Sequence, residues 1–168
     1  ASDVYKRQGS GCILLSLLKE CPLAEGTGVD VSPEALAVAR ENAARLGVSG
    51  RCSFVNQSWS EWKPENEKWD MIVSNPPYIP RGDIAGLDAE VKDYDPHLAL
   101  DGGEDGYGCY REIAGLVPLI LQKGGYILLE SGMGQAEDIM RIFSAQGLET
   151  VAVIPDLAGI NRCVILKK

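Results

Sequence analysis

The sequence predicts one α/β domain, built on a doubly wound and mostly parallel sheet that ends in an antiparallel strand pair. Apolar runs with strand and helix periodicity alternate along the chain, as they do in successive βα units. A glycine turn, Gly9-Ser10-Gly11, comes directly before the first helix-like run. The last two apolar runs, 149–154 and 162–166, have strand character and are close enough in sequence to pair as a hairpin.

The expected elements follow one another in regular order. We expect helices at 12–20, 33–46, 107–122 and 135–146, and strands at 26–31, 52–56, 69–74, 125–130, 149–154 and 162–166. The second helix has the clearest signals, because Ser32 can cap it, Pro33 suits its first turn and Gly47 can end it. Its apolar face is expected to contain Leu36, Ala39, Ala43 and Leu46.

Length and composition limit the classes of function. The 168 residues fit one domain, and no apolar run approaches the roughly 18 residues that span a bilayer. The net charge of −8 disfavours a nucleic-acid partner, because phosphate contacts need a basic patch. The N-terminus lacks the features of a secretory signal, so we expect a cytoplasmic protein. Five widely spaced cysteines and one histidine predict reduced thiols and no metal site.

Gly9, Gly11 and Asp30 have the spacing of a ligand site at the first turn of such a sheet. A glycine turn lets a ligand approach the backbone, and an acid about 20 residues later can receive ribose hydroxyls. Leu14 replaces the third glycine of a fuller G-x-G-x-x-G, so this turn does not choose between a dinucleotide and S-adenosylmethionine. An ordinary strand-to-helix turn explains the same glycines. Trp59 either lines an adenine pocket or packs in the core.

Asn75-Pro76-Pro77-Tyr78 follows the strand at 69–74, at the edge where open α/β sheets place their ligand crevice. The two prolines donate no backbone hydrogen bonds and hold the chain extended. The Asn75 side chain and the Pro76 carbonyl can accept from an NH₂ group, while the Tyr78 ring lies on its flat face. Such acceptors aim the nitrogen lone pair at a methyl donor and offset the charge that grows on nitrogen. A rigid turn leaving a strand is the alternative.

Three features near this motif have open interpretations. The stretch from Tyr78 to about Glu104 is rich in Asp, Gly and Pro, and we expect a substrate-facing loop. Glu130 ends a strand and either faces the crevice or caps the residues after it. Arg162 pairs with a carboxylate such as Asp156 or contacts an acidic partner.

With these residues assembled, the chain from Gly9 to Lys168 resembles the release factor glutamine N5-methyltransferase family, whose class I methyltransferase fold is Rossmann-like. DNA and RNA amino-methyltransferases share the tetrapeptide at 75–78, so the other marks make the resemblance more specific. They are Ile72-Val73-Ser74, Tyr94-Asp95-Pro96, Leu98-Ala99-Leu100-Asp101-Gly102-Gly103, Leu129-Glu130, Asp156-Leu157-Ala158-Gly159 and Arg162.

The resemblance implies a cofactor, an acceptor and a partner. S-adenosylmethionine would donate the methyl group and leave as S-adenosylhomocysteine. The acceptor would be the glutamine amide nitrogen in the Gly-Gly-Gln loop of a peptide-chain release factor. The implied catalytic residues are Asn75, Pro76 and Tyr78, and Asn75, Pro76, Pro77 and Tyr78 would bind the glutamine. The residues implied to contact the cofactor are Gly9, Ser10, Gly11, Asp30, Trp59 and Asn75.

The chain departs from the family near its N-terminus and after one strand. The expected D-x-G-x-G-S-G opening is Tyr5-Lys6-Arg7-Gln8-Gly9-Ser10-Gly11 here, without its acid or its first glycine. Residues 1–8 are polar where a buried first strand should be apolar, and we expect the family's helical N-terminal recognition domain to be absent. We therefore expect a foreign or truncated segment at 1–8 and the catalytic domain at 9–168. Ser58 stands where the family commonly has an acid near adenine.

Two other functions stay open on the sequence alone. An adenine-N6 or guanine-N2 nucleic-acid methyltransferase uses the same chemistry on a flipped base, with Tyr78 stacked on it. A folded fragment without catalytic activity is the second alternative, because the glycine turn departs from the family pattern. The oligomeric state is not indicated by the sequence.

Overall fold

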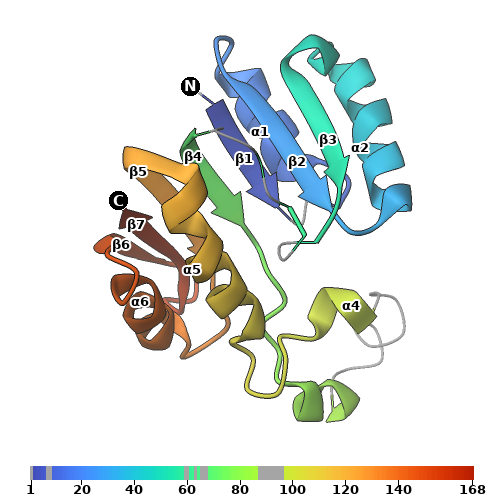
Figure 1. Ribbon diagram of the computed structural model, residues 1–168. Helices are drawn as coiled ribbons and strands as arrows, with labels where there is room; N and C mark the ends of the chain where they lie inside the picture. The colour runs from blue at the N-terminus through green and yellow to red at the C-terminus, as the bar shows by residue number, and fades with distance from the viewer. Residues whose placement is uncertain (1, 7–8, 59–60, 63, 65–67, 87–96) are drawn as a thin grey trace.

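The structure is a computed structural model that describes residues 2–6, 9–58, 61–62, 64, 68–86 and 97–168. Within these residues the chain forms a seven-stranded sheet with helices beside it (Figure 1). The strands are β1 (Ser2–Lys6), β2 (Glu25–Asp30), β3 (Cys52–Asn56), β4 (Trp69–Ser74), β5 (Leu121–Glu130), β6 (Glu149–Pro155) and β7 (Asn161–Lys167). The helices are α1 (Cys12–Glu20), α2 (Pro33–Leu46), α4 (His97–Leu100), α5 (Gly108–Ile120) and α6 (Ala136–Ser144), with 3-10 turns η1 (Ser49–Arg51) and η2 (Arg81–Gly86).

The sheet has the predicted doubly wound topology. Its strands lie in the order β3-β2-β1-β4-β5-β7-β6. The first five in this order are parallel, whereas β7 is antiparallel to both β5 and β6. The predicted terminal antiparallel pair is therefore confirmed. The strand order reverses between β1 and β4, which makes this the topological switch point where such sheets bind ligands.

β1 corrects the predicted start of the sheet. Because of their polarity, residues 1–8 are predicted to lie outside the catalytic domain. In the structure, Ser2–Lys6 forms a central strand that pairs in parallel with β2 on one side and β4 on the other. Backbone hydrogen bonds to two neighbours define a strand whatever its side chains. The sheet therefore begins before Gly9, and the foreign origin of residues 1–8 stays a prediction.

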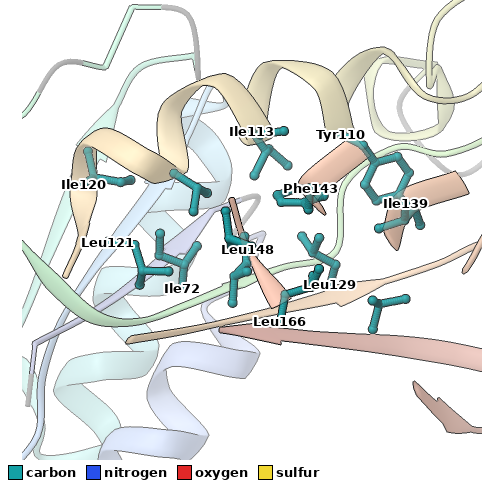
Figure 2. Packing of buried hydrophobic residues seen from close by; sticks show 14 of the residues in the cluster. Ile72, Tyr110, Ile113, Ile120, Leu121, Leu129, Ile139, Phe143, Leu148 and Leu166 are labelled. Atoms are coloured by element: carbon teal, nitrogen blue, oxygen red, sulfur yellow. The ribbon is translucent and has the colours of Figure 1, made fainter. Parts of the chain in front are cut away.

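Side chains alternate between the two faces of the sheet, and each face has its own apolar cluster. In β4, Ile72 is buried in the larger cluster, whereas Met71 and Val73 pack against the smaller one, as strand geometry requires. The larger cluster contains side chains of α5, of α6 and of the sheet, and Figure 2 shows them gathered in one core. Its largest fully buried side chains include Tyr110, Ile113 and Phe143. The smaller cluster contains Leu14, Leu15 and Leu18 of α1.

The four predicted helices all form, with differences at some of their ends and at one predicted core residue, and the short helix α4 was not predicted. In α2, Ser32 Oγ accepts from Ala35 N at 3.0 Å, and Gly47 ends the helix in the left-handed conformation, as expected. Leu46 was expected in the core but is 41% exposed, because it lies at the margin of the apolar stripe at 3.6 residues per turn. α5 ends at Ile120 because β5 begins at once with Leu121. Across the described ranges, no helix is long and apolar enough to cross a membrane.

Gly11 allows the start of α1 to pack closely against α2. Its φ of 87° lies in the left-handed region, and a Cβ there would stand 2.8 Å from Leu15 Cδ1 and 3.2 Å from Ala39 Cβ. Both atoms belong to buried side chains. This glycine therefore has a packing role that is independent of any ligand.

We predict that Gly11→Ala lowers the free energy of unfolding by about 1–3 kcal/mol, through left-handed strain and overpacking. The matched control is Gly115→Ala in the exposed part of α5, where no described atom lies within 4 Å of an added Cβ. Alanine is the better helix former, so the control should raise the free energy of unfolding by roughly 0.5–1 kcal/mol. Urea denaturation measures both, and effects of equal sign would contradict the packing role.

Candidate active site

The carboxyl ends of adjacent parallel strands are aligned at the switch point. The register pairs Lys6 of β1 with Val29 of β2 and with Ser74 of β4. Asp30 and Asn75 are the next residues on these two neighbours, so they stand at the same level on either side of β1. With strands about 4.8 Å apart, the two backbones are separated by about 10 Å. One small molecule lying across β1 can reach both residues.

Asp30 holds the glycine turn with its carboxylate. Oδ2 accepts a hydrogen bond from Gly9 N at 3.0 Å, and Oδ1 accepts one from Ser32 N at 2.9 Å. Each carboxylate oxygen has two lone pairs, so the group retains capacity for two more donors. The structure thus brings Gly9 and Asp30 together, and the remaining acceptor capacity matches a pair of ribose hydroxyls.

The three residues of the glycine turn have different surroundings. Gly9 has a φ of 50°, and no described atom lies within 4 Å of a Cβ built on it, so its backbone is open to a ligand. The Ser10 carbonyl accepts a hydrogen bond from Asn42 Nδ2 of α2 at 2.9 Å. The turn is therefore fixed to the helices at Ser10 and Gly11 and to Asp30 through the Gly9 N–H, while no described atom fills the space beside the Gly9 Cα.

The adenine side of the predicted site is only partly described. Trp59, the predicted adenine contact, lies outside the described residues. Just before it, Ser58 Oγ donates to Glu61 Oε2 at 2.9 Å, and Ser58 N donates to the same oxygen at 3.3 Å. These bonds lower the pKa of the Glu61 carboxyl. A charged carboxylate is thus held against Ser58, the position where the sequence lacks the acid of the family.

The segment 75–78 leaves the sheet at the end of β4 and extends toward α4 and η2 (Figure 1). Both prolines are buried, and Tyr78 is partly buried against the larger apolar cluster. Immediately after it, Ile79 N donates to Leu100 O at 3.2 Å, and the Ile79 carbonyl accepts from Gly102 N at 2.8 Å. The loop expected between Tyr78 and Glu104 therefore folds back on itself within its described parts, while residues 87–96 lie outside the description.

A cavity of about 420 Å³ lies beside Asn75 and is also lined by Glu130 of β5 and Arg162 of β7. Of the two interpretations of Glu130, the structure supports the one in which it faces the crevice. Arg162 Nε donates to Asp156 Oδ2 at 3.1 Å, which confirms that predicted pair. A second cavity, of about 430 Å³ and lined by residues such as Trp69, lies where the strands begin and is remote from Asn75.

Charged and phenolic groups near the start of α5 keep fixed protonation states. Hydrogen bonds from the Arg111 guanidinium lower the pKa of Asp105 to about 2. Burial, together with the hydrogen bond that Tyr107 donates to Asp138 Oδ2 at 2.8 Å, raises the pKa of Tyr107 to about 12. Asp105 is therefore charged and Tyr107 neutral near pH 7, and their hydrogen bonds to Arg111 and Asp138 join this loop to α5 and α6.

The structure adds Gln135, which the sequence indicates only as the start of a helix. Its side chain is 8% exposed and hydrogen-bonds both to Gly132 N and to the Tyr78 carbonyl. A polar residue just after Gly132-Met133-Gly134 and before an amphipathic helix looks like an ordinary capping residue in sequence. Its hydrogen bond to the Tyr78 carbonyl joins residues 57 positions apart, and no local sequence pattern predicts it.

Comparison with known proteins identifies relatives of this chain among methyltransferases. A family model described as a methyltransferase domain matches residues 8–94. The release factor glutamine methyltransferase of Rhodospirillum rubrum is 44% identical over 160 residues, which are 95% of this chain and 49% of the relative. That of Cereibacter sphaeroides is 47% identical over 156 residues, which are 93% of this chain and 55% of the relative. The chain thus spans about half the length of these curated relatives.

Solved structures with low sequence identity share the fold. A methyltransferase from Pyrococcus furiosus has a TM-score of 0.73 at 16% identity, covering 99% of this chain and 74% of that structure. TrmN from Thermus thermophilus has a TM-score of 0.69 at 19% identity, covering 99% of this chain and 43% of that structure. The predicted class I methyltransferase fold is confirmed. By its matched family model, this chain belongs to the methyltransferase domain family, and it is similar in sequence to release factor glutamine methyltransferases.

Proposed function

We propose that this chain transfers a methyl group from S-adenosylmethionine to the side-chain amide nitrogen of a glutamine. The proposed glutamine lies in the Gly-Gly-Gln loop of a peptide-chain release factor. The observation that carries the proposal is the position of Asn75-Pro76-Pro77-Tyr78 at the carboxyl end of β4, level with Asp30 across β1. The name shared by the relatives supports the release factor as the partner. The cytoplasmic location expected from the sequence is part of this proposal.

The residues around β1 fit the cofactor. When bound, S-adenosylmethionine supplies an electrophilic methyl group on its sulfonium. We assign the ribose hydroxyls to the free acceptor capacity of Asp30, and the open backbone to Gly9. Ser10 and Gly11 support this turn from the helix side. Trp59 beside adenine, and Asn75 between cofactor and acceptor, complete the proposed site.

Groups that accept hydrogen bonds from its N–H bonds hold the acceptor amide. The Asn75 side-chain oxygen and the Pro76 carbonyl accept from the two N–H bonds of the glutamine amide, and the Tyr78 ring lies on its flat face. Pro77 keeps this segment extended. The two acceptors turn the nitrogen lone pair toward the methyl carbon and offset the positive charge that develops on nitrogen. The nitrogen releases one proton as its new bond to carbon forms.

Two measurements test the proposal together. The first is calorimetric titration of the chain with S-adenosylmethionine and with S-adenosylhomocysteine. The second is transfer of labelled methyl groups to a release factor, to the same factor with its Gly-Gly-Gln glutamine replaced, and to RNA or DNA. Binding with transfer only to the intact factor supports the proposal. Transfer to a nucleic-acid base identifies the alternative acceptor, and absence of binding identifies an inactive fragment.

We predict that Asp30→Asn weakens S-adenosylmethionine binding about 10- to 100-fold, because hydrogen bonds to a charged acceptor contribute about 1.5–3 kcal/mol. The isosteric amide keeps an acceptor for the glycine turn, so the fold should persist. Calorimetry gives the dissociation constant. The control is Glu149→Gln, which removes an exposed charge at the start of β6, opposite the site edge, and should leave the affinity unchanged. Equal affinities for wild type and Asp30→Asn would contradict the ribose assignment.

Asn75→Ala is expected to lower the rate of methyl transfer about 10²–10³-fold, since it removes an acceptor aimed at developing charge. Its effect on cofactor affinity should be much smaller, because Asp30 and Gly9 are unchanged. Single-turnover transfer at saturating cofactor measures the rate, and calorimetry measures the affinity. A wild-type rate in this variant would remove Asn75 from the catalytic residues.

A further inference from the structure

Gln135 joins two loops at the site edge through one buried side-chain amide. It follows β5 at the N-terminus of α6 and is 8% exposed. Its Oε1 accepts a hydrogen bond from Gly132 N at 3.0 Å, and its Nε2 donates one to the Tyr78 carbonyl at 3.0 Å. The β5–α6 loop is thereby tied to the last residue of the segment 75–78.

Three glycines fit closely around this link. A Cβ on Gly106 would lie 2.6 Å from the Tyr78 carbonyl oxygen and 2.9 Å from Gln135 Nε2. A Cβ on Gly132 would lie 2.6 Å from Gln135 Oε1, and one on Gly102 would lie 2.8 Å from the Tyr78 carbonyl carbon. Backbone from two segments, the loop at 102–106 and the β5–α6 loop, therefore encloses the amide and the carbonyl, and leaves little freedom for either to move.

The segment 75–78 is anchored at its exit. Two of its four residues are prolines, which have no backbone N–H to donate. The Tyr78 carbonyl is bonded to Gln135, and the next residue, Ile79, is bonded through both its N–H and its carbonyl to the chain at 100–102. These contacts fix the direction in which the segment leaves β4.

We infer that Gln135 is a positioning residue for methyl transfer, and this inference rests on the proposed function. By holding the Tyr78 carbonyl, Gln135 sets the place of the Pro76 carbonyl and of the Tyr78 ring, while touching neither cofactor nor acceptor. A displacement of about 1 Å in such groups can lower a rate about 100-fold. The expected signature is a lower kcat with an unchanged dissociation constant for the cofactor, because Asp30 ends β2 on the far side of β1 and Gly9 follows β1 itself.

The variant Gln135→Glu distinguishes a role of the hydrogen bond to the Tyr78 carbonyl from a role of the side-chain volume alone. The ionised carboxylate still accepts from Gly132 N but has no proton to donate to the Tyr78 carbonyl, whereas the neutral acid restores that donor. Burial raises the pKa of a carboxyl, so protonation should occur as the pH falls from about 8 to about 6. We expect kcat at about pH 8 to fall tenfold or more relative to wild type, and the ratio of variant to wild type to recover toward one at about pH 6.

The matched control is Gln146→Glu, which makes the same substitution at an exposed position after α6. It should keep the wild-type kcat at every pH. A second variant, Gln135→Met, keeps the side-chain length but removes both hydrogen bonds, and should show the loss of kcat without recovery at low pH. A kcat ratio for Gln135→Glu that is independent of pH, or a wild-type kcat in Gln135→Met, would overturn the inference.

Hydrogen exchange provides a readout that does not require methyl transfer. In Gln135→Met, the amides of Ile79 and Gly102 should exchange about tenfold faster or more, while the amides of β6 and β7 keep their wild-type rates. Equal acceleration throughout the domain would show general destabilisation and would contradict a local anchor. If the wild-type chain transfers no methyl group, the proposed function fails, and an unchanged exchange rate at Ile79 separately rejects the anchor.

Discussion

The shared register of the parallel strands is the constraint on which the candidate site depends. Because Lys6 pairs with both Val29 and Ser74, the next residues on β2 and β4 reach the same edge at the same level. Parallel strands all end at one edge, and the reversal of order between β1 and β4 leaves that edge uncovered at its centre. Asp30 and Asn75 are thereby brought together although the sequence separates them widely.

Two sets of hydrogen bonds hold the loops that follow the aligned strand ends in place. On one side, the Asp30 carboxylate fixes the glycine turn through Gly9 N, while keeping acceptor capacity of its own. On the other side, Gln135 fixes the Tyr78 carbonyl. A charged acceptor suits the side that is proposed to bind hydroxyl groups. A neutral amide suits the enclosed side, since burying a charge there would cost more free energy.

The proposed reaction relies on alignment more than on proton transfer, and the electrostatics of the site edge agree with this. The pKa shifts of Asp105 and Tyr107 move both groups away from neutral pH. Their partners, Arg111 and Asp138, lie on α5 and α6, so these pairs tie the helices to the loop that contains Gly102 and Gly106. That loop in turn encloses the Tyr78 carbonyl. A continuous set of contacts thus joins α5 and α6 to the Tyr78 carbonyl.

Local sequence signals predict the order and type of the strands and of the longer helices from Gly9 onward, because helix and strand periodicity, the Ser32 cap and the Gly47 stop each act within a few residues. The sequence also determined Asp30 and the segment 75–78 as site candidates, since strand ends can be located from apolar runs. The fold was required to show that the polar residues Ser2–Lys6 form the central strand, because backbone pairing with β2 and β4 overrides their composition. It alone showed that Gly11 is needed for helix packing. The link from Gln135 to Tyr78 also required the fold, because a hydrogen bond between residues 57 positions apart leaves no periodic trace in sequence.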